Sequence, residues 1–202
     1  MYKTDKHAAK LGESNTVPTD DAVQGKAAML QTKFVGIGGL GKMAAGNIFV
    51  GKFGAIDGTN GIIHLGQPFN LRPTKLKGYY KYKTGPIDQA DKSMEHLKGM
   101  TDSMSIYIAL GDWNEPVEIR TNPNNRKLFD VNDPHIIAYK AMITSEEQSE
   151  YIPFELELEY RSTSRIPNYI IVIASSSKLG DYFTGSTQSV LYVDEFSLEW
   201  DY

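Results

Sequence analysis

The chain has 202 residues, of which 41% are hydrophobic and 23% charged, and it contains no cysteine. This balance supports one globular domain with a sizeable core, while the lack of cysteine excludes disulfides, zinc–cysteine centres and thiol nucleophiles. The formal net charge is −4, so there is no basic field to hold a phosphate backbone. We therefore expect no nucleic-acid partner.

The N-terminal segment, residues 1–25, is polar and has no clean periodicity. We expect a loop or an edge strand there, followed by a single β-sandwich domain over residues 26–202. No apolar run reaches the roughly 18 residues that span a membrane, and no signal peptide is visible. The chain is therefore either cytoplasmic or a piece of a longer exported protein, and we favour the second because of the resemblance described below.

Nine segments with strand character follow, separated by Gly, Pro, Asn and Asp. They are residues 26–32, 47–53, 62–65, 76–84, 104–110, 136–143, 153–160, 169–174 and 190–200. Only residues 86–97 look partly helical, with one further turn at 145–150. Because a parallel α/β fold needs a helix between most strands, the pattern predicts an all-β fold, an antiparallel β-sandwich of jelly-roll type.

Strict alternation assigns side chains to faces in two of these segments, and a third is apolar on both faces. In residues 153–160 and 76–84 every second side chain is apolar, which predicts a core-facing row, while the glutamates and lysines between them face solvent. The segment 169–174 is apolar on both faces and is typical of a central strand covered on both sides. The core-facing residues predicted in this way are Phe154, Leu156, Leu158, Tyr160, Leu76, Tyr80 and Tyr82.

The last strand contains two acids in an apolar run. Without a bulge, alternation points Asp194 inward together with Tyr192 and Phe196, and turns Glu195 towards solvent. A buried carboxylate must meet N–H groups, a cation or a metal. Calcium takes 6–8 oxygen ligands, so a structural calcium at Asp194 is one hypothesis. The alternatives are a β-bulge that turns both acids outward, or a carboxylate that caps the N–H groups of a loop.

Three stretches carry a family resemblance: AAGNIFVGKF, GQPFNLRPTKLKGYYKYKTG and ASSSKLGDYFTGSTQSVLYVDEFSLEW. Together they resemble the putative carbohydrate metabolism domain (PCMD) of Bacteroidetes surface lipoproteins, over roughly residues 24–202. The resemblance implies a jelly roll similar to carbohydrate-binding modules, at the C-terminal end of a longer, lipid-anchored protein on the cell surface. The only membrane link would then be an anchor upstream. In related jelly rolls an Asp of the last strand helps to hold a structural calcium, and Asp194 occupies the comparable place. The resemblance supplies no catalytic residues.

Two motifs that resemble ligand-binding signatures are interpreted as ordinary connections between strands. Residues 36–41 fit G-x-G-x-x-G, but no helix fits before the next strand, so we expect a flexible loop and no nucleotide. Residues 57–61 (DGTNG) are interpreted as a turn, with a cation site as the alternative. The histidines are scattered without metal-site spacing, and we expect each to be a surface or loop residue: His7, His64, His96 and His135.

Carboxylates for a glycosidase are available, but their pairing cannot be read from the sequence. The candidates are Asp112, Glu115, Glu118, Glu155, Glu157 and Glu159. The last three form a row that we interpret as a solvated strand face opposite the lysines of residues 76–84.

Sugar binding needs flat rings with polar groups at their edges. The candidate ligand-binding residues are Trp113, Tyr79, Tyr107, Tyr182 and Phe183. The alternative is that these rings pack on the sandwich and its loops. The function favoured by the sequence is non-catalytic binding of a glycan or polysaccharide at the cell surface. The alternatives are a structural or adhesion module that binds a protein partner, and a glycoside-active enzyme.

Overall fold

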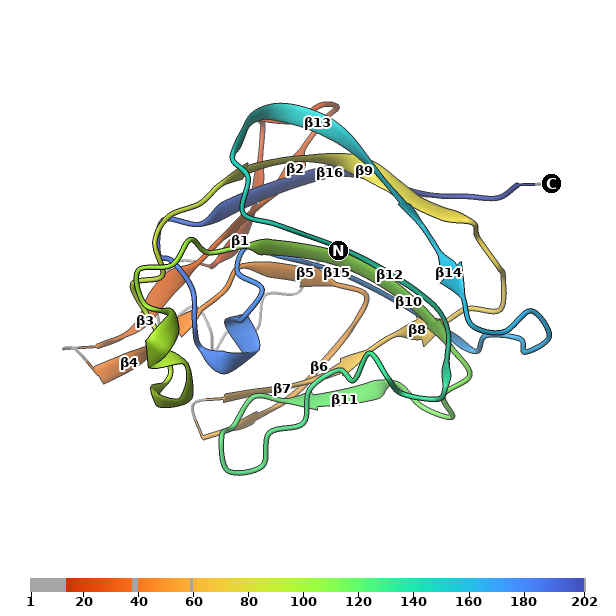
Figure 1. Ribbon diagram of the computed structural model, residues 1–202, viewed down its shortest axis with the longest axis horizontal. Coiled ribbons are helices and arrows are strands. Elements are labelled where there is room, and N and C mark those ends of the chain that lie inside the picture. Colours follow the sequence, from red (N-terminus) through yellow and green to blue (C-terminus); the bar gives the residue numbers. More distant parts are fainter. Residues whose placement is uncertain (1–13, 38–39, 59, 202) are drawn as a thin grey trace.

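The computed structural model describes residues 14–37, 40–58 and 60–201, and these form an all-β protein with three layers (Figure 1). All neighbouring strands are antiparallel. The predicted class, an all-β antiparallel sandwich, is confirmed.

The first layer is a five-stranded sheet in the order β1-β2-β16-β9-β13. The last strand in the chain, β16, therefore lies at its centre, and β1 forms an edge within the N-terminal segment. The strands are β1 (Thr16–Thr19), β2 (Ala27–Gln31), β16 (Val190–Glu199), β9 (Lys75–Lys83) and β13 (Gln148–Glu157).

The middle layer is a six-stranded sheet in which β14-β12-β10-β15-β5 are neighbours and β8 also pairs with β15. Its bounds are β14 (Glu159–Tyr160), β12 (Ile136–Thr144), β10 (Met104–Gly111), β15 (Tyr169–Ser175), β5 (Asn47–Phe49) and β8 (Gln67–Pro68).

The third layer is a three-stranded sheet in the order β11-β7-β6. A separate hairpin, β3–β4, and two short 3-10 helices, η2 and η3, lie at one end of the sandwich (Figure 1). These elements are β11 (Val117–Arg120), β7 (Asn60–Leu65), β6 (Gly51–Asp57), β3 (Lys33–Ile37), β4 (Leu40–Ala44), η2 (Lys92–Leu97) and η3 (Gly180–Tyr182).

Two hydrophobic cores separate the layers. The first core lies between the five-stranded and six-stranded sheets and includes Leu30, Tyr82, Ile106 and Leu191. The second core lies between the six-stranded and three-stranded sheets. Its buried members are Leu65, Ala109, Trp113, Ile119, Ile136 and Ile171. β15 contributes to both cores, which confirms the prediction of a central strand covered on both faces.

The predicted faces of β9 and β13 are confirmed. Leu76, Tyr80, Tyr82, Phe154, Leu156 and Leu158 are buried, and Tyr160 of β14 is packed against them. On the opposite face Lys77 forms ion pairs with Glu155 at 3.1 Å and with Glu199 at 2.6 Å. Glu155 therefore faces lysines of β9, as expected, whereas Glu159 belongs to β14 and pairs with Lys140 of β12.

Two local predictions were wrong. Within the glycine-rich segment 36–41, where a flexible loop was expected, residues 36–37 and 40–41 are paired in the antiparallel hairpin β3–β4, and residues 38–39 lie outside the described part of the chain. Residues 145–150 do not make a helical turn, because β13 already begins at Gln148. The edge strand β1 lies in the N-terminal segment, where a loop or an edge strand was expected. Strands β3, β4, β8 and β11 were not predicted, because segments of two to five residues are too short for a reliable alternation.

The assumed phase of the last strand was also wrong. Leu191 and Val193 point into the first core, so Asp194 lies on the other face of β16. The register then shifts between Asp194 and Ser197, and Glu195 adopts a left-handed backbone with φ of 51°. This is a β-bulge, and it returns Phe196 to the core side, where it packs against the first core.

Candidate functional site

A cleft of about 410 Å³ opens beside β11, between this strand and the loop that precedes β12. Its wall includes the indole of Trp113 and the ring of His135, and its other lining residues are mostly polar or charged. The lining residues are His64, Trp113, Asn114, Glu115, Pro116, Val117, Glu118, Lys127, Asp133 and His135. We refer to this feature as the cleft.

The end of β10 places Trp113 in the wall of the cleft. Gly111 is the last residue of β10, and a Cβ atom there would come within 2.5 Å of the six-membered ring of Trp113. The indole therefore lies directly on the bare backbone of Gly111, which only glycine permits. Trp113 is only 6% exposed, so its packing in the second core fixes the ring rigidly.

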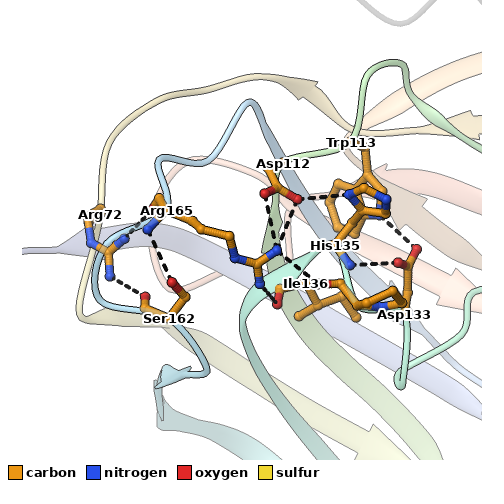
Figure 2. Close-up of polar contacts among 9 residues, drawn as sticks. Arg72, Asp112, Trp113, Asp133, His135, Ile136, Ser162 and Arg165 are labelled. Carbon is orange, nitrogen blue, oxygen red and sulfur yellow. Dashed lines mark hydrogen bonds and ion pairs between the residues drawn. The ribbon is translucent and has the colours of Figure 1, made fainter.

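The polar edge of the indole is tied to the loop before β12 (Figure 2). Trp113 Nε1 donates a hydrogen bond to Asp133 Oδ2 at 2.9 Å, and the backbone N–H of His135 donates to Asp133 Oδ1 at 2.8 Å. Asp133 Oδ2 thus ties the indole to this loop, while Oδ1 fixes the turn within the loop itself.

His135 is held by a second carboxylate. Its Nδ1 lies 3.0 Å from Asp112 Oδ1, and Arg165 Nη1 donates to Asp112 Oδ2 at 3.1 Å. The same guanidinium donates to the carbonyl oxygens of Pro134, at 2.9 Å, and Ile136, at 3.0 Å. Arg165 therefore clamps the backbone on both sides of His135 (Figure 2).

The clamp is itself supported by the segment after β14. Arg72 Nη1 donates to the carbonyl of Arg165 at 2.7 Å, and Nη2 donates to the carbonyl of Ser162 at 2.8 Å. The Arg72 guanidinium also stacks 4.4 Å from the centre of the Tyr160 ring. Arg72 thus fixes the segment after β14, from which Arg165 reaches Asp112.

The carboxylates of the cleft differ in their environment. Glu118 forms an ion pair with Arg120 Nε at 2.8 Å, and this hydrogen-bonded pair holds the pKa of Glu118 below its usual value. Glu115 is exposed, and no hydrogen bond from a described residue occupies its carboxylate. A ligand therefore meets Glu115 as an open acceptor and Glu118 as a carboxylate that stays ionised.

Of the five aromatic residues predicted to bind a ligand, only Trp113 lines the cleft. Tyr107 stacks on Phe129 with ring centres 5.4 Å apart, and burial raises the pKa of its hydroxyl. The Tyr107 ring is therefore covered by the loop that precedes β12. Tyr107 therefore packs on the sandwich and its loops, which is the alternative to ligand binding given for these rings above.

Tyr182 and Phe183 lie at the end of the sandwich near η3, each beside a cation. Arg126 stacks over Tyr182 at 4.6 Å, and Lys42 lies over Phe183 at 4.5 Å from the ring centre. Tyr79 lies on the outer face of β9, across the first sheet from the core. The structure therefore does not gather the five rings into one groove.

Asp194 is only 7% exposed and binds backbone N–H groups. Its Oδ2 accepts from Val23 at 2.8 Å and from Gln24 at 3.1 Å, and its Oδ1 accepts from Glu195 at 2.9 Å. Three N–H dipoles that point at one carboxylate repel a cation, so this donor set does not fit calcium. Asp194 has the loop-capping role weighed as an alternative.

Within residues 14–37, 40–58 and 60–201, no three His, Asp or Glu side chains gather closely enough to hold a metal ion. The described part of the chain also contains no helix long and apolar enough to cross a membrane. The structural calcium itself stays a prediction.

The sequence did not reveal that His64, Asp133 and His135 share the cleft. The histidines have no recognisable spacing, because they come from a strand of the third layer and from a loop. One signal was present: Asp133-Pro-His135 follows a turn and immediately precedes a buried strand, a position at which loop side chains are commonly fixed by the scaffold.

The three-layered antiparallel β-sandwich defines the class of protein as an all-β domain with a polar cleft. The chain belongs to the family described as "Putative carbohydrate metabolism domain" (PCMD), which matches residues 2–199. No curated protein matches the sequence.

Two solved structures are similar. One is described as a putative glycoside hydrolase from Bacteroides thetaiotaomicron, with 26% identity, a TM-score of 0.71, and coverage of 93% of this chain and 57% of that one. The other is described as a putative glycoside hydrolase from Bacteroides vulgatus, with 25% identity, a TM-score of 0.68, and coverage of 93% and 78%. The chain therefore spans little more than half of the first of these proteins.

Proposed function

We propose that this domain binds a glycan non-catalytically in the cleft. The observation that carries the proposal is the combination of a 410 Å³ cleft with an indole in its wall and a polar rim. A cleft of this size lies in the range of small-molecule sites. Membership of a carbohydrate metabolism family supports a sugar as the occupant.

The side chains of the cleft suit sugar chemistry. Trp113 is 6% exposed and forms a fixed wall of the cleft, while the rim supplies carboxylate, amide and imidazole groups for the hydroxyls of a sugar. Because Trp113, Asp133 and His135 are already fixed by hydrogen bonds to one another and to the backbone, little ordering entropy is lost when a ligand binds.

A glycan array with the purified domain tests the proposal, followed by calorimetry on the glycans that bind. Two exposed cleft residues, Asn114 and Glu115, are suitable for variants because no described residue depends on their side chains. Asn114→Ala and Glu115→Gln should each weaken binding by about tenfold, the equivalent of one lost hydrogen bond. Glu157→Gln, the same change on the far face of β13, should have no effect. The absence of binding to every glycan would overturn the proposal.

A second candidate is a glycoside-active enzyme, which the descriptions of the two similar structures favour. Hydrolysis needs two carboxylates across the cleft, with a raised pKa on the acid. Glu118 does not meet this requirement, because Arg120 lowers its pKa, and Asp133 is occupied by Trp113 and His135. Glu115 remains as the open carboxylate. Release of reducing sugar by the wild type, lost in Glu115→Gln, would replace the binding function with the enzymatic one.

The cell surface is the proposed location of the parent protein, with a lipid anchor upstream of this domain. The support is the resemblance of this sequence to the PCMD domains of Bacteroidetes surface lipoproteins. Protease treatment of intact cells that express the full-length protein tests the location, because only a surface-exposed domain is removed while the membrane remains sealed.

A further inference from the structure

His135 is the most firmly oriented exposed side chain of the cleft. Its side chain is 54% exposed, yet its backbone N–H is bonded to Asp133 and its Nδ1 to Asp112. The carbonyls before and after it are held by Arg165. The backbone of His135 is thus fixed on both sides, and the contact between Nδ1 and Asp112 orients the exposed imidazole, so less rotamer freedom is lost when a ligand binds.

The contact with Asp112 determines the tautomer of the neutral ring. Asp112 accepts hydrogen bonds from Arg165 with both oxygens, at 3.3 and 3.1 Å. Its carboxylate therefore acts as an acceptor and has no hydrogen to donate to His135. The hydrogen in its contact with His135 must then lie on Nδ1. In a neutral imidazole the other nitrogen, Nε2, is consequently a hydrogen-bond acceptor. No described residue donates to it.

We propose that His135 is a ligand-contacting, specificity-determining residue of the cleft, which accepts a hydrogen bond from a sugar hydroxyl through Nε2 and, with its acidic surroundings, selects neutral over acidic glycans. This inference rests on the proposed glycan-binding function. In it Asp112 and Arg165 are positioning residues that act through His135.

The charges around His135 support the selection. Asp112 and Arg165 neutralise each other beneath the ring, and Asp133 lies on its other side. Across the cleft stand Glu115, Glu118 and Lys127, together with the ring of His64. The three carboxylates that line the cleft, Glu115, Glu118 and Asp133, outnumber Lys127 and the Arg120 guanidinium that pairs with Glu118. The carboxylate of a uronic acid or a sulfate group therefore meets an excess of like charge. A neutral sugar presents hydroxyl donors to these acceptors instead.

Two substitutions separate ligand contact from a merely structural role. In His135→Gln the side-chain amide reaches the place of Nε2, so the group that faces the ligand is kept and the bond to Asp112 is lost. In His135→Asn the shorter amide stands in for Nδ1, so the bond to Asp112 is kept and the ligand-facing group is removed. Both are measured against Glu157→Gln as the remote control.

The probes are neutral and acidic hexasaccharides of matched sugars: hexamers of glucose, mannose and galactose beside hexamers of glucuronate, mannuronate and galacturonate. We expect the wild type to bind at least one neutral hexamer and to bind its uronate counterpart at least tenfold more weakly. His135→Asn should lose about tenfold in affinity, the loss of one hydrogen bond, while His135→Gln stays within about threefold of the wild type.

The opposite order of the two variants, with His135→Asn equal to the wild type and His135→Gln impaired, would show that His135 only braces Asp112 and would overturn the inference. Equal binding of neutral and uronate hexamers would overturn the selectivity. Absence of binding to any glycan on a broad array, with all variants folded, would instead remove the proposed function itself.

Discussion

The indole of Trp113 lies flat on the backbone of Gly111, at the point where β10 ends and its register with β12 shifts. The contact is so close that no side chain fits between them. A glycine at the end of a buried strand is therefore a condition for the wall of the cleft, because any Cβ atom would push the indole away from Asp133.

Gly111→Ala is expected to destabilise the domain by about 2 kcal/mol, the usual range for overpacking a rigid core, and to disturb the cleft. Thermal unfolding followed by tryptophan fluorescence measures both effects. Gly61→Ala is the matched control, because a Cβ atom there would have its nearest neighbour at 4.0 Å. Equal stability of the two variants would show that Trp113 can move without cost.

Asp102 is a buried carboxylate that is satisfied by neutral donors alone. It is 3% exposed, and its Oδ2 accepts from the hydroxyls of Ser177 and Ser189 and from the backbone N–H of Ser186, while Oδ1 accepts from Ser103 N–H. Asp102→Asn replaces one acceptor oxygen with an N–H₂ group, which must face one of these donors.

We expect Asp102→Asn to lower the free energy of unfolding by about 3 kcal/mol, since a bond to a charged group is lost and a buried donor is left unpaired. Urea denaturation measures the change. Asp88→Asn serves as control, because Asp88 bonds Thr187 at the exposed surface and should cost less than about 1 kcal/mol. Similar values for the two variants would contradict the burial argument.

Asp57 joins the turn between β6 and β7 to the loop 121–125. Asn122 Nδ2 and Asn125 Nδ2 donate to its Oδ2 at 2.9 and 3.2 Å, and these bonds lower its pKa below the usual 3.8. A lowered pKa stabilises the fold above the pKa of the unfolded chain, and this contribution is lost as the pH falls through the folded value.

Asp57→Asn should therefore lower Tm at pH 7, and the difference from the wild type should shrink as the pH falls below about 3.8. Melting curves between pH 7 and pH 2 test this. A difference that stays constant across the range would show that the ionised form of Asp57 is not what holds the loop.

Asp194 caps the loop of residues 20–25 by accepting hydrogen bonds from the N–H groups of Val23 and Gln24. Asp194→Ala should cost about 2 kcal/mol and speed hydrogen exchange at the amides of Val23 and Gln24. Asp20→Ala, which removes an exposed carboxylate paired with Lys26, should do neither. In the wild type, addition of a calcium chelator should leave Tm unchanged; a fall in Tm would reveal a calcium site elsewhere in the protein.

Strong alternation made most of the sheet predictable. Leu76, Tyr80 and Tyr82 face the core as their spacing requires, because a strand half-buried on one face carries a period of two. The hairpin β3–β4 was missed because its glycines suggest a loop. The phase of β16 was missed because Glu195 adopts a positive φ without being glycine, and no local sequence signal marks such a bulge.

The candidate site was less predictable because its residues meet only through the packing of layers. Trp113 was identified as a candidate, but its contact with Asp133 depends on a loop twenty residues later in the chain. Tyr107 was a candidate ligand-binding ring, yet Phe129 stacks on it. Periodicity reports on which face a side chain lies; it cannot report which loop covers that face.

The central place of β16 in the first sheet has a consequence for biosynthesis. Among the described strands, β16 is the one that pairs with both β2 and β9. β2 and β9 are synthesised earlier, so the sheet between them forms only after residues 190–199 have been synthesised. Such long-range pairing folds slowly and leaves strand edges open in the meantime. The nascent chain is therefore exposed to aggregation and to chaperones until its last strand has left the exit tunnel.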